Sequence, residues 1–217
     1  MSIFPQLEKN KGTVSSQLGK DLAKEVLQND QLDILTEAVE LVCYDLNNPK
    51  AKKIRAGAAK IIEIVAEKKP GLVIPYLNQI FPAMEVPEPQ TRWMLYRVYG
   101  FCAQAGSDLM EEVATLARTT IREKVDGQLC LVSSADLFLG DWGSLNRESC
   151  DRAFPILVES SDNILMNEHD WIFESFIKMI PLLTDQEKKT VLSIVEEFED
   201  HPRKATLKRI EKIKNKL

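Results

Sequence analysis

Residues 48–62 read NPKAKKIRAGAAKII, and about 37 residues further along the chain residues 88–98 read EPQTRWMLYRV. Each stretch has a proline as its second residue and continues with a β-branched residue, an arginine and apolar residues at helical spacing. Self-similarity at this period is typical of solenoid repeats, in which each copy is one pair of helices. One pair is too small to bury its own apolar face, so stacked copies share a continuous core. The repeat therefore predicts an all-α chain that presents an extended surface.

The composition predicts one folded, soluble repeat domain. The chain has 217 residues, 44% of them hydrophobic, which is enough to build a core. We expect a single domain over residues 1–217, in which residues 1–14 could form an irregular N-terminal segment. The longest apolar runs, 129–132 and 177–183, fall far short of the roughly 20 residues that a membrane span requires, so we expect no membrane partner.

The N-terminus and the cysteines indicate a cytoplasmic protein. The first six residues, MSIFPQ, lack the basic and apolar regions of a secretory signal. Spacings of 59, 28 and 20 residues separate Cys43, Cys102, Cys130 and Cys150, so they form no CxxC pair and no zinc ligand set. We expect all four to be reduced, small core residues.

Apolar residues recur at helical spacing almost everywhere, and no strand-like run is bounded by turn residues. We expect about eleven helices, and their short connections make neighbours antiparallel. Within the fourth helix, Pro75 is early enough to be tolerated, whereas Pro82 must bend or end the helix. The expected ranges run from a cap at Ser15-Ser16 to about 29, then 32–46, 50–69, 72–84, 90–105, 108–123, 127–140, 146–160, 168–182, 185–199 and 202–216.

These features resemble the HEAT-repeat proteins, which are α-solenoids of antiparallel helix pairs. The likeness rests on the proline-led entries, on the Ile54-Arg55 and Thr91-Arg92 stretches, and on first-helix prolines at Pro75, Pro155 and Pro181. It is strongest from about residue 50 to 104. Beyond that the period continues at 37 to 40 residues, with 129–140, 170–180 and 203–213 in the equivalent place, although two of these copies lack the arginine. The resemblance implies a right-handed α-solenoid of about five HEAT-like helix pairs.

The chain offers few converging groups for catalysis. It has two histidines, His169 and His201, which are too few for the repeated His-Glu pairs of the HEAT-like di-iron enzymes. Adjacent residues on a helix do not share a site, so Glu168-His169-Asp170 is not a metal cluster. The sequence has no Walker, dinucleotide-binding or nucleophile-elbow motif. We therefore expect no catalytic residue, no metal site and no cofactor.

The segment from Gly140 to Gly143 has the glycines of a helix C-cap and turn. We expect its Trp142 to fill the junction between two helix pairs.

An enzymatic alternative is a DNA-binding protein that resembles the HEAT-like alkylpurine DNA glycosylases. Trp93, Trp142 and Trp171 fall on three repeats, and Asp136 lies in the stretch 133–141. That family needs a Trp and Asp pair just before this stretch, yet residues 125–131 contain no tryptophan. Residues 162–199 are also strongly acidic, which disfavours contacts with phosphates. Nucleic acid is therefore the less favoured partner.

Charge is distributed unevenly along the chain. The net charge is −5, yet residues 201–217 carry seven Lys or Arg and one Glu, so the preceding residues total −11. One interpretation is a capping helix with a solvated polar face. The other is an electrostatic site for nucleic acid or an acidic protein. The candidate basic patch consists of Arg203, Lys204, Lys208, Arg209 and Lys212.

The favoured hypothesis is a non-enzymatic HEAT-repeat scaffold that presents a concave groove to another protein. Second helices line the concave face in such solenoids, and arginine and aromatic residues dominate binding hot spots. The candidate groove therefore consists of Arg55, Arg92, Trp93, Tyr96 and Arg97. The alternative is structural, with Arg55 and Arg92 bridging to carboxylates of neighbouring repeats and Trp93 in the core.

Overall fold

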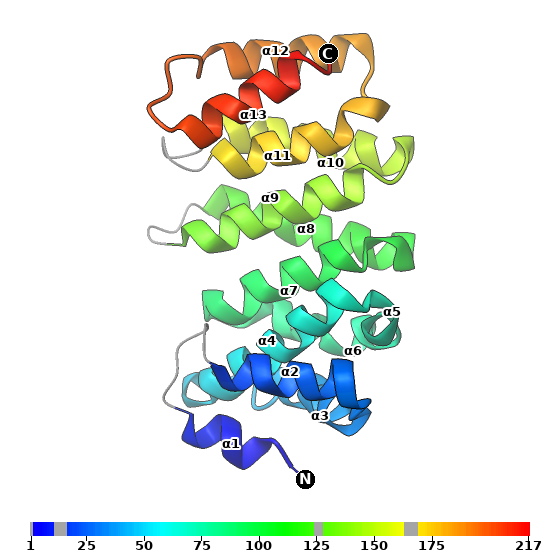
Figure 1. Cartoon of the computed structure of the whole chain (residues 1–217), viewed down its shortest axis with the longest axis vertical. Coiled ribbons are helices and arrows are strands. Elements are labelled where there is room, and N and C mark those ends of the chain that lie inside the picture. The colour runs from blue at the N-terminus through cyan, green and yellow to red at the C-terminus, as the bar shows by residue number, and fades with distance from the viewer. Residues whose placement is uncertain (1, 11–16, 124–127, 163–168) are drawn as a thin grey trace. The chain divides into compact units, whose positions relative to one another are not determined.

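The computed structural model describes residues 2–10, 17–123, 128–162 and 169–217. Every regular element within these ranges is a helix, which confirms the all-α prediction (Figure 1). The expected cap at Ser15-Ser16 lies outside the described residues. Contacts divide the chain into two compact units, Met1–Ala105 and Gly106–Leu217, and each is described by itself. The prediction of a single repeat domain over residues 1–217 stays a prediction.

Unit 1 is a two-layered stack of helices. One layer contains α2, α4 and α7, and the other contains α3 with the short helices that follow α4 (Figure 1). Adjacent copies of the sequence repeat thus place their second helices, α4 and α7, side by side. The elements of unit 1 are α1 (Phe4–Lys9), α2 (Gln17–Asn29), α3 (Leu32–Val42), η1 (Pro49–Ala51), α4 (Lys52–Lys68), α5 (Pro70–Val73), η2 (Ile74–Tyr76), α6 (Leu77–Ile80), η3 (Phe81–Glu85), α7 (Pro89–Phe101) and η4 (Ala103–Ala105).

The core of unit 1 forms around α4. Its apolar positions at helical spacing are all buried, as the sequence predicts: Ile54, Ala58, Ile61, Ile62 and Val65. Leu7 of α1 packs so closely on this helix that a methyl group added at Gly57 would lie 2.7 Å from Leu7 Cδ2. The Glu37 carboxylate accepts hydrogen bonds from the backbone N–H groups of Ile3 and Phe4 and so fixes the start of α1. Residues 4–9 are therefore helical, and irregular structure is the wrong expectation for them.

The segment 72–84 is not the single helix that the hydrophobic pattern predicts. It is divided into α5, η2, α6 and η3, and the breaks occur at Pro75 and Pro82. Proline supplies no backbone N–H and clashes with the preceding turn, so each one interrupts the α-helical ladder. Our expectation that Pro75 is tolerated within one helix is wrong. A second correction concerns α3, which ends at Val42 rather than near residue 46.

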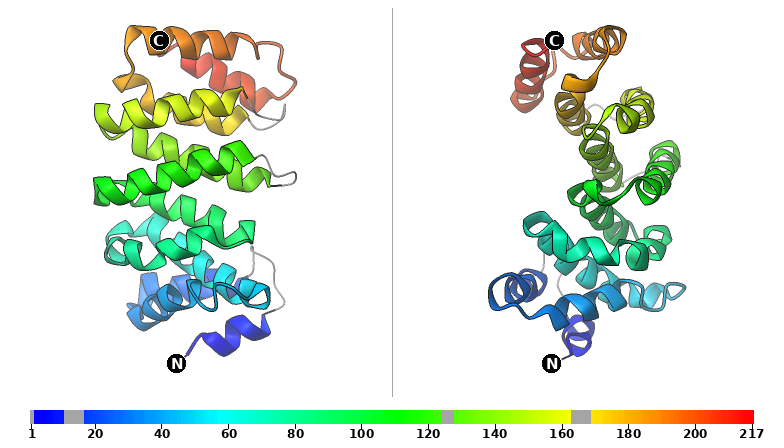
Figure 2. Two further views of the ribbon diagram at one scale, coloured as in Figure 1. Left: turned by 180° about the vertical axis from the view of Figure 1, so that it is seen from behind. Right: turned by 90° about the vertical axis from the view of Figure 1, so that its right-hand side faces the viewer.

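Unit 2 has the same two-layered design. One layer contains α9, α11 and α13, and the other contains α8, α10 and α12 (Figure 2). The first of these layers holds the stretches 129–140, 170–180 and 203–213 that the sequence period places in equivalent positions. The elements of unit 2 are α8 (Ser107–Glu123), α9 (Leu129–Gly143), α10 (Arg147–Ser161), α11 (His169–Met179), η5 (Ile180–Leu182), α12 (Asp185–Glu196) and α13 (Lys204–Lys214).

Two helices of unit 2 begin with capping boxes, in which side chains satisfy the free backbone N–H groups of the first turn. Asn146 and Ser149 form one at the start of α10, and Thr184 and Glu187 form the other at the start of α12. The guanidinium of Arg147 joins these two starts, because it donates to the Glu187 carboxylate at 2.7 Å. Local capping and packing between repeats therefore support each other.

Helix α9 continues through Gly140 to Gly143, so our interpretation of this segment as a C-cap and turn is wrong. The glycines serve close packing instead. A methyl group added at Gly140 would lie 2.5 Å from Ser175 Cβ of α11. Trp142 is buried and stacks on Phe138 at 6.1 Å between ring centroids.

The four cysteines are free thiols. Cys102 and Cys150 are buried and Cys43 is half-buried, but Cys130 is exposed. The expectation of a buried thiol is wrong for Cys130, because this residue lies in the first turn of α9 and faces solvent. No helix in the described part of the chain is long and apolar enough to cross a bilayer.

Candidate functional site

Arg55, the arginine of the sequence repeat, is fully buried on α4. Its Nε and Nη2 donate to the two oxygens of Glu88 at 2.6 and 2.8 Å. Its Nη1 donates to the backbone carbonyls of Tyr44, Asp45 and Asn48 at 3.2, 2.7 and 3.2 Å. A planar guanidinium suits this bidentate arrangement, which a lysine cannot reproduce. Arg55 therefore joins the turn before η1 to the start of α7.

Two residues of the predicted groove are consequently not available to a partner. Arg55 and Tyr96 are both 0% exposed. Arg55 is the inter-repeat brace that the structural alternative describes, and Tyr96 lies on the core side of α7. Arg92 is half-buried, and it lies five residues and about 140° around the helix from Arg97, so the two do not share a face. The prediction that these residues form one cluster with Trp93 and Arg97 is wrong.

Trp93 and Arg97 do lie on a common surface, together with residues that the sequence did not single out. The α4–α7 surface, as we define it, consists of half-buried side chains on adjacent helices: Lys60, Glu63, Trp93, Arg97 and Phe101. Positions 93, 97 and 101 are four apart and so face the same way along α7. Because α4 and α7 are packed side by side, the surface is continuous across them.

Contacts within the α4–α7 surface hold its side chains in place. The Lys60 ammonium lies 5.7 Å from the centroid of the Trp93 ring, and it donates to Glu63 at 2.6 Å. The Arg97 guanidinium lies 4.6 Å from the centroid of the Phe101 ring. Burial raises the pKa of Glu63, and the hydrogen bond from Lys60 opposes that rise. The α4–α7 surface therefore brings together two aromatic rings, two cations and one carboxylate.

Unit 2 exposes a tryptophan in its corresponding helix layer. Trp171 of α11 is 39% exposed, although both of its neighbours, Asp170 and Ile172, are buried. Its position on a second helix and its aromatic side chain were signals that could have identified it as a candidate contact residue.

The predicted basic patch on α13 divides into two sets. The arginines fasten α13 to α11: Arg203 lies 3.2 Å from Asp170, and Arg209 lies 3.3 Å from Glu174. Thr206 adds a hydrogen bond to the same buried Asp170 at 2.7 Å. The lysines are exposed and recur every fourth residue, so they form one stripe of Lys204, Lys208 and Lys212.

Asp136, which lies in the stretch 133–141 that the glycosylase alternative rests on, is fully buried on α9. Burial raises its pKa to about 7, and the nearby Ser160 hydroxyl opposes part of that rise. Neither carboxylate oxygen makes a hydrogen bond of good geometry to a described residue. A side chain enclosed in this way has no access to a base, so its position does not support that alternative.

Among the residues that the structure describes, no group of three or more His, Cys, Asp or Glu side chains is placed to hold a metal ion. His169 and His201 are both buried, and their ring centroids lie 6.2 Å apart. His201 accepts a hydrogen bond through Nδ1 from the Arg203 backbone N–H at 3.1 Å, next to the first turn of α13. This hydrogen bond gives His201 a structural role.

No protein-family model matches the chain, and no curated protein sequence matches it. Solved structures do match. One is a designed armadillo repeat protein with a TM-score of 0.59 at 10% identity, covering 98% of this chain and 97% of that one. Another is an engineered protein with a TM-score of 0.60 at 12% identity, covering 100% of this chain and 98% of that one. Identities this low show the fold alone, and that fold is an armadillo- or HEAT-like helical repeat.

Proposed function

We propose that this protein is a non-enzymatic scaffold that binds another protein through the α4–α7 surface. The observation that supports this function best is the combination of Trp93, Arg97 and Phe101 on one face of α7. Aromatic and arginine side chains contribute most to protein interfaces when rigid surroundings hold them. These three are held by cation–π contacts within the surface, so binding would cost little side-chain entropy.

A basic site on α13 is the second candidate. The exposed stripe of Lys204, Lys208 and Lys212 favours an anionic partner. The two arginines of the patch are already engaged by carboxylates of α11. An acidic protein surface is a better match than DNA, because the first 200 residues carry a net charge of −11, which repels a phosphate backbone.

We further propose that the protein works in the cytoplasm. All four cysteines are free thiols, which is the usual state in a reducing compartment.

The test of the scaffold function is a quantitative pull-down with the full chain, in which mass spectrometry identifies the bound proteins. Arg97→Glu should remove a stoichiometric partner, because it reverses a charge in the centre of the surface. Lys68→Glu is the matched control, since Lys68 is an exposed residue of α4 outside the surface. The melting temperature of Lys68→Glu should stay close to that of the wild type, because exposed charges contribute little to stability. Arg97 is half-buried, so the melting temperature of Arg97→Glu is measured as well, to distinguish loss of the partner from loss of the fold.

Two results would contradict this assignment. One is the absence of any stoichiometric partner, and the other is a partner that binds the Arg97→Glu variant as well as the wild type. Duplex DNA is the third arm of the experiment. Binding whose log–log salt slope is roughly −0.9 per phosphate contacted would favour the nucleic-acid alternative instead.

A further inference from the structure

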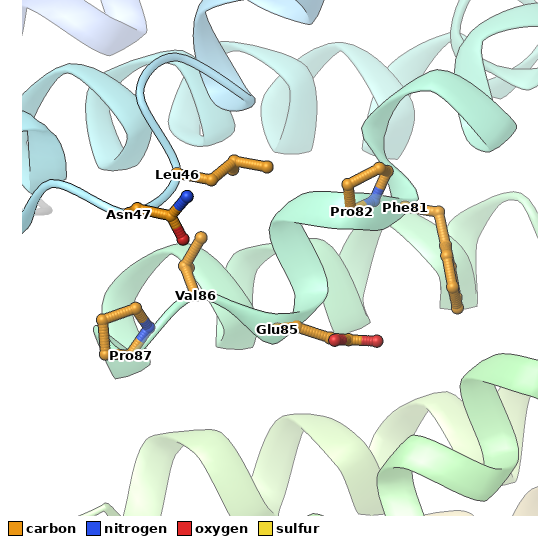
Figure 3. Close-up of a pocket in the computed structure, with 7 residues that line it drawn as sticks. All are labelled: Leu46, Asn47, Phe81, Pro82, Glu85, Val86 and Pro87. Atoms are coloured by element: carbon orange, nitrogen blue, oxygen red, sulfur yellow. The ribbon is translucent and has the colours of Figure 1, made fainter.

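Unit 1 contains a pocket of about 570 Å³ between the turn that follows α3 and the η3–α7 connection (Figure 3). Its size falls within the range of about 300 to 1,000 Å³ that is usual for binding pockets. The lining is mostly apolar, and Asn47 and Glu85 supply its polar side chains. In Figure 3 the Leu46 side chain points toward Pro82, and the Glu85 carboxylate extends below Phe81. The lining residues are Leu46, Asn47, Phe81, Pro82, Glu85, Val86 and Pro87.

The walls of this pocket are fixed by the buried Arg55. Its Nη1 holds the carbonyls of residues 44, 45 and 48, which flank the lining residues Leu46 and Asn47. Its Nε and Nη2 hold Glu88, which directly follows the lining residues Val86 and Pro87. One side chain therefore connects both walls. Because the backbone of both walls is already ordered, a ligand would not have to pay for ordering it.

Charge determines what kind of ligand fits. Glu85 is exposed, and it forms no ion pair with any residue that the structure describes. No lysine, arginine or histidine lines the pocket. A cation in this place would donate a charge-assisted hydrogen bond to Glu85 and would contact the ring of Phe81. An apolar side chain beside it would cover Leu46, Val86 and Pro87.

We propose that this pocket binds a short extended segment of a partner protein in which an arginine or lysine lies next to an apolar residue. The cation pairs with Glu85, and the apolar residue fills the space between Leu46 and Val86. This site is separate from the α4–α7 surface, because the two share no residue. Loss of partner binding at that surface therefore leaves this proposal standing, and the reverse also holds.

The test uses the full-length protein and a displayed library of random heptapeptides as the probe. Peptides are selected for binding to the wild type, and those that also bind the Glu85→Lys variant are removed. The remaining peptides should carry a basic residue beside an apolar one. The most enriched peptide is then synthesised, and its binding is followed by backbone amide shifts. The shifts should concentrate at residues 44–48 and 81–88.

Substitutions then separate the contributions of charge. Glu85→Lys should lower the affinity for the selected peptide by about tenfold or more, because it replaces attraction of the peptide's cation with repulsion. Asn47→Lys places a cation on the exposed edge of the pocket and should also lower the affinity for the selected peptide. Because this variant keeps Glu85, agreement between the two variants shows that the loss does not come from a folding defect caused by Glu85→Lys. Glu8→Lys, on the exposed side of α1, is the matched control and should change the affinity by less than about twofold.

The proposal fails if the selection yields no peptide, or if the enriched peptides lack a basic residue. It also fails if the amide shifts map outside residues 44–48 and 81–88. Equal loss of affinity in the Glu85→Lys and Glu8→Lys variants would show a general charge effect and would overturn it as well.

Discussion

Arg55 shows how one residue can serve repeat packing when the sequence alone favours a surface role. The repeat pattern gives Arg55 the same place in its copy as Arg92 in the next one, and the sequence does not reveal which of the two has a partner. Its partner, Glu88, lies 33 residues further along the chain, at the corresponding start of the next repeat. The pairing therefore depends on the distance between stacked helices, which only the folded structure supplies.

Replacing Arg55 with alanine should destabilise unit 1 by about 3 to 5 kcal/mol, because it leaves the Glu88 carboxylate buried without its cation. Three backbone carbonyls also lose a donor. Urea unfolding followed by circular dichroism measures the change. Arg97→Ala is the control and should cost less than about 1 kcal/mol, because its guanidinium is half-exposed. Similar costs for the two variants would contradict the brace.

Asp136 should make the stability of the protein depend on pH near neutrality. Burial raises its folded-state pKa to about 7 from a usual value of 3.8. The folded state therefore binds this proton more tightly than the unfolded state, and the stabilisation is lost as pH rises from about 4 to 7. Asp136→Asn removes the ionisation and should raise stability at pH 8 by up to about 4 kcal/mol.

The comparison of the two proteins at pH 5 and pH 8 checks this expectation. The difference between wild type and Asp136→Asn should be roughly 2 to 3 kcal/mol smaller at pH 5 than at pH 8, because at pH 5 the carboxyl is neutral in the folded state but already ionised in the unfolded state. It should vanish only below about pH 4, where the side chain is neutral in both states. Glu40→Gln, an exposed substitution on α3, should show no such pH-dependent difference from the wild type. A constant difference at both pH values would mean that Asp136 stays ionised in the core.

At the scale of helices, the hydrophobic period is a good guide to where elements lie and a poor one to where they break. It places α2, α4, α7 and α8 within a few residues of their observed bounds. It fails over 72–84, because the spacing of apolar residues carries no information about backbone hydrogen bonds, and the two prolines in this segment lack the N–H group that such a bond needs. It also misses the pocket, because turns and connections that carry no periodic signal form its walls.

Gly140→Ala should push α9 and α11 apart. The new methyl carbon would lie 2.5 Å from Ser175 Cβ and 2.6 Å from its Cα, and the backbone atom has no free rotation by which to avoid it. We expect a loss of about 1 to 3 kcal/mol, as is usual for overpacked cores. Gly71→Ala is the control, since a methyl there meets no described atom within 4 Å. Equal stability of the two variants in thermal unfolding would show that the helix layer adapts.

For the molecule as a whole, the cysteines report on folding, because they differ in burial. Burial raises the pKa of Cys102 to about 12 and that of Cys150 to about 11, and it also raises the pKa of Cys43. Thiolate is the reactive form, so these three should react slowly with a thiol reagent. Cys130 is exposed and should react first. The folded protein should therefore consume one equivalent of thiol reagent quickly, and the unfolded protein should consume four without reductant. Fast reaction of a second equivalent in the folded protein would contradict the burial of the other three thiols.

The same thiols test whether the chain unfolds as one domain or as two units. In helical repeat proteins stability is largely a sum over repeats and their nearest neighbours, so damage stays local. Arg55→Ala should speed the labelling of Cys102 in unit 1 more than that of Cys150 in unit 2. Gly140→Ala should do the opposite, because its clash lies within unit 2. Labelling below the denaturant midpoint, followed by peptide mass spectrometry, gives both rates in one sample. If each substitution speeds both thiols equally, the chain opens as one cooperative block and the two units do not unfold independently.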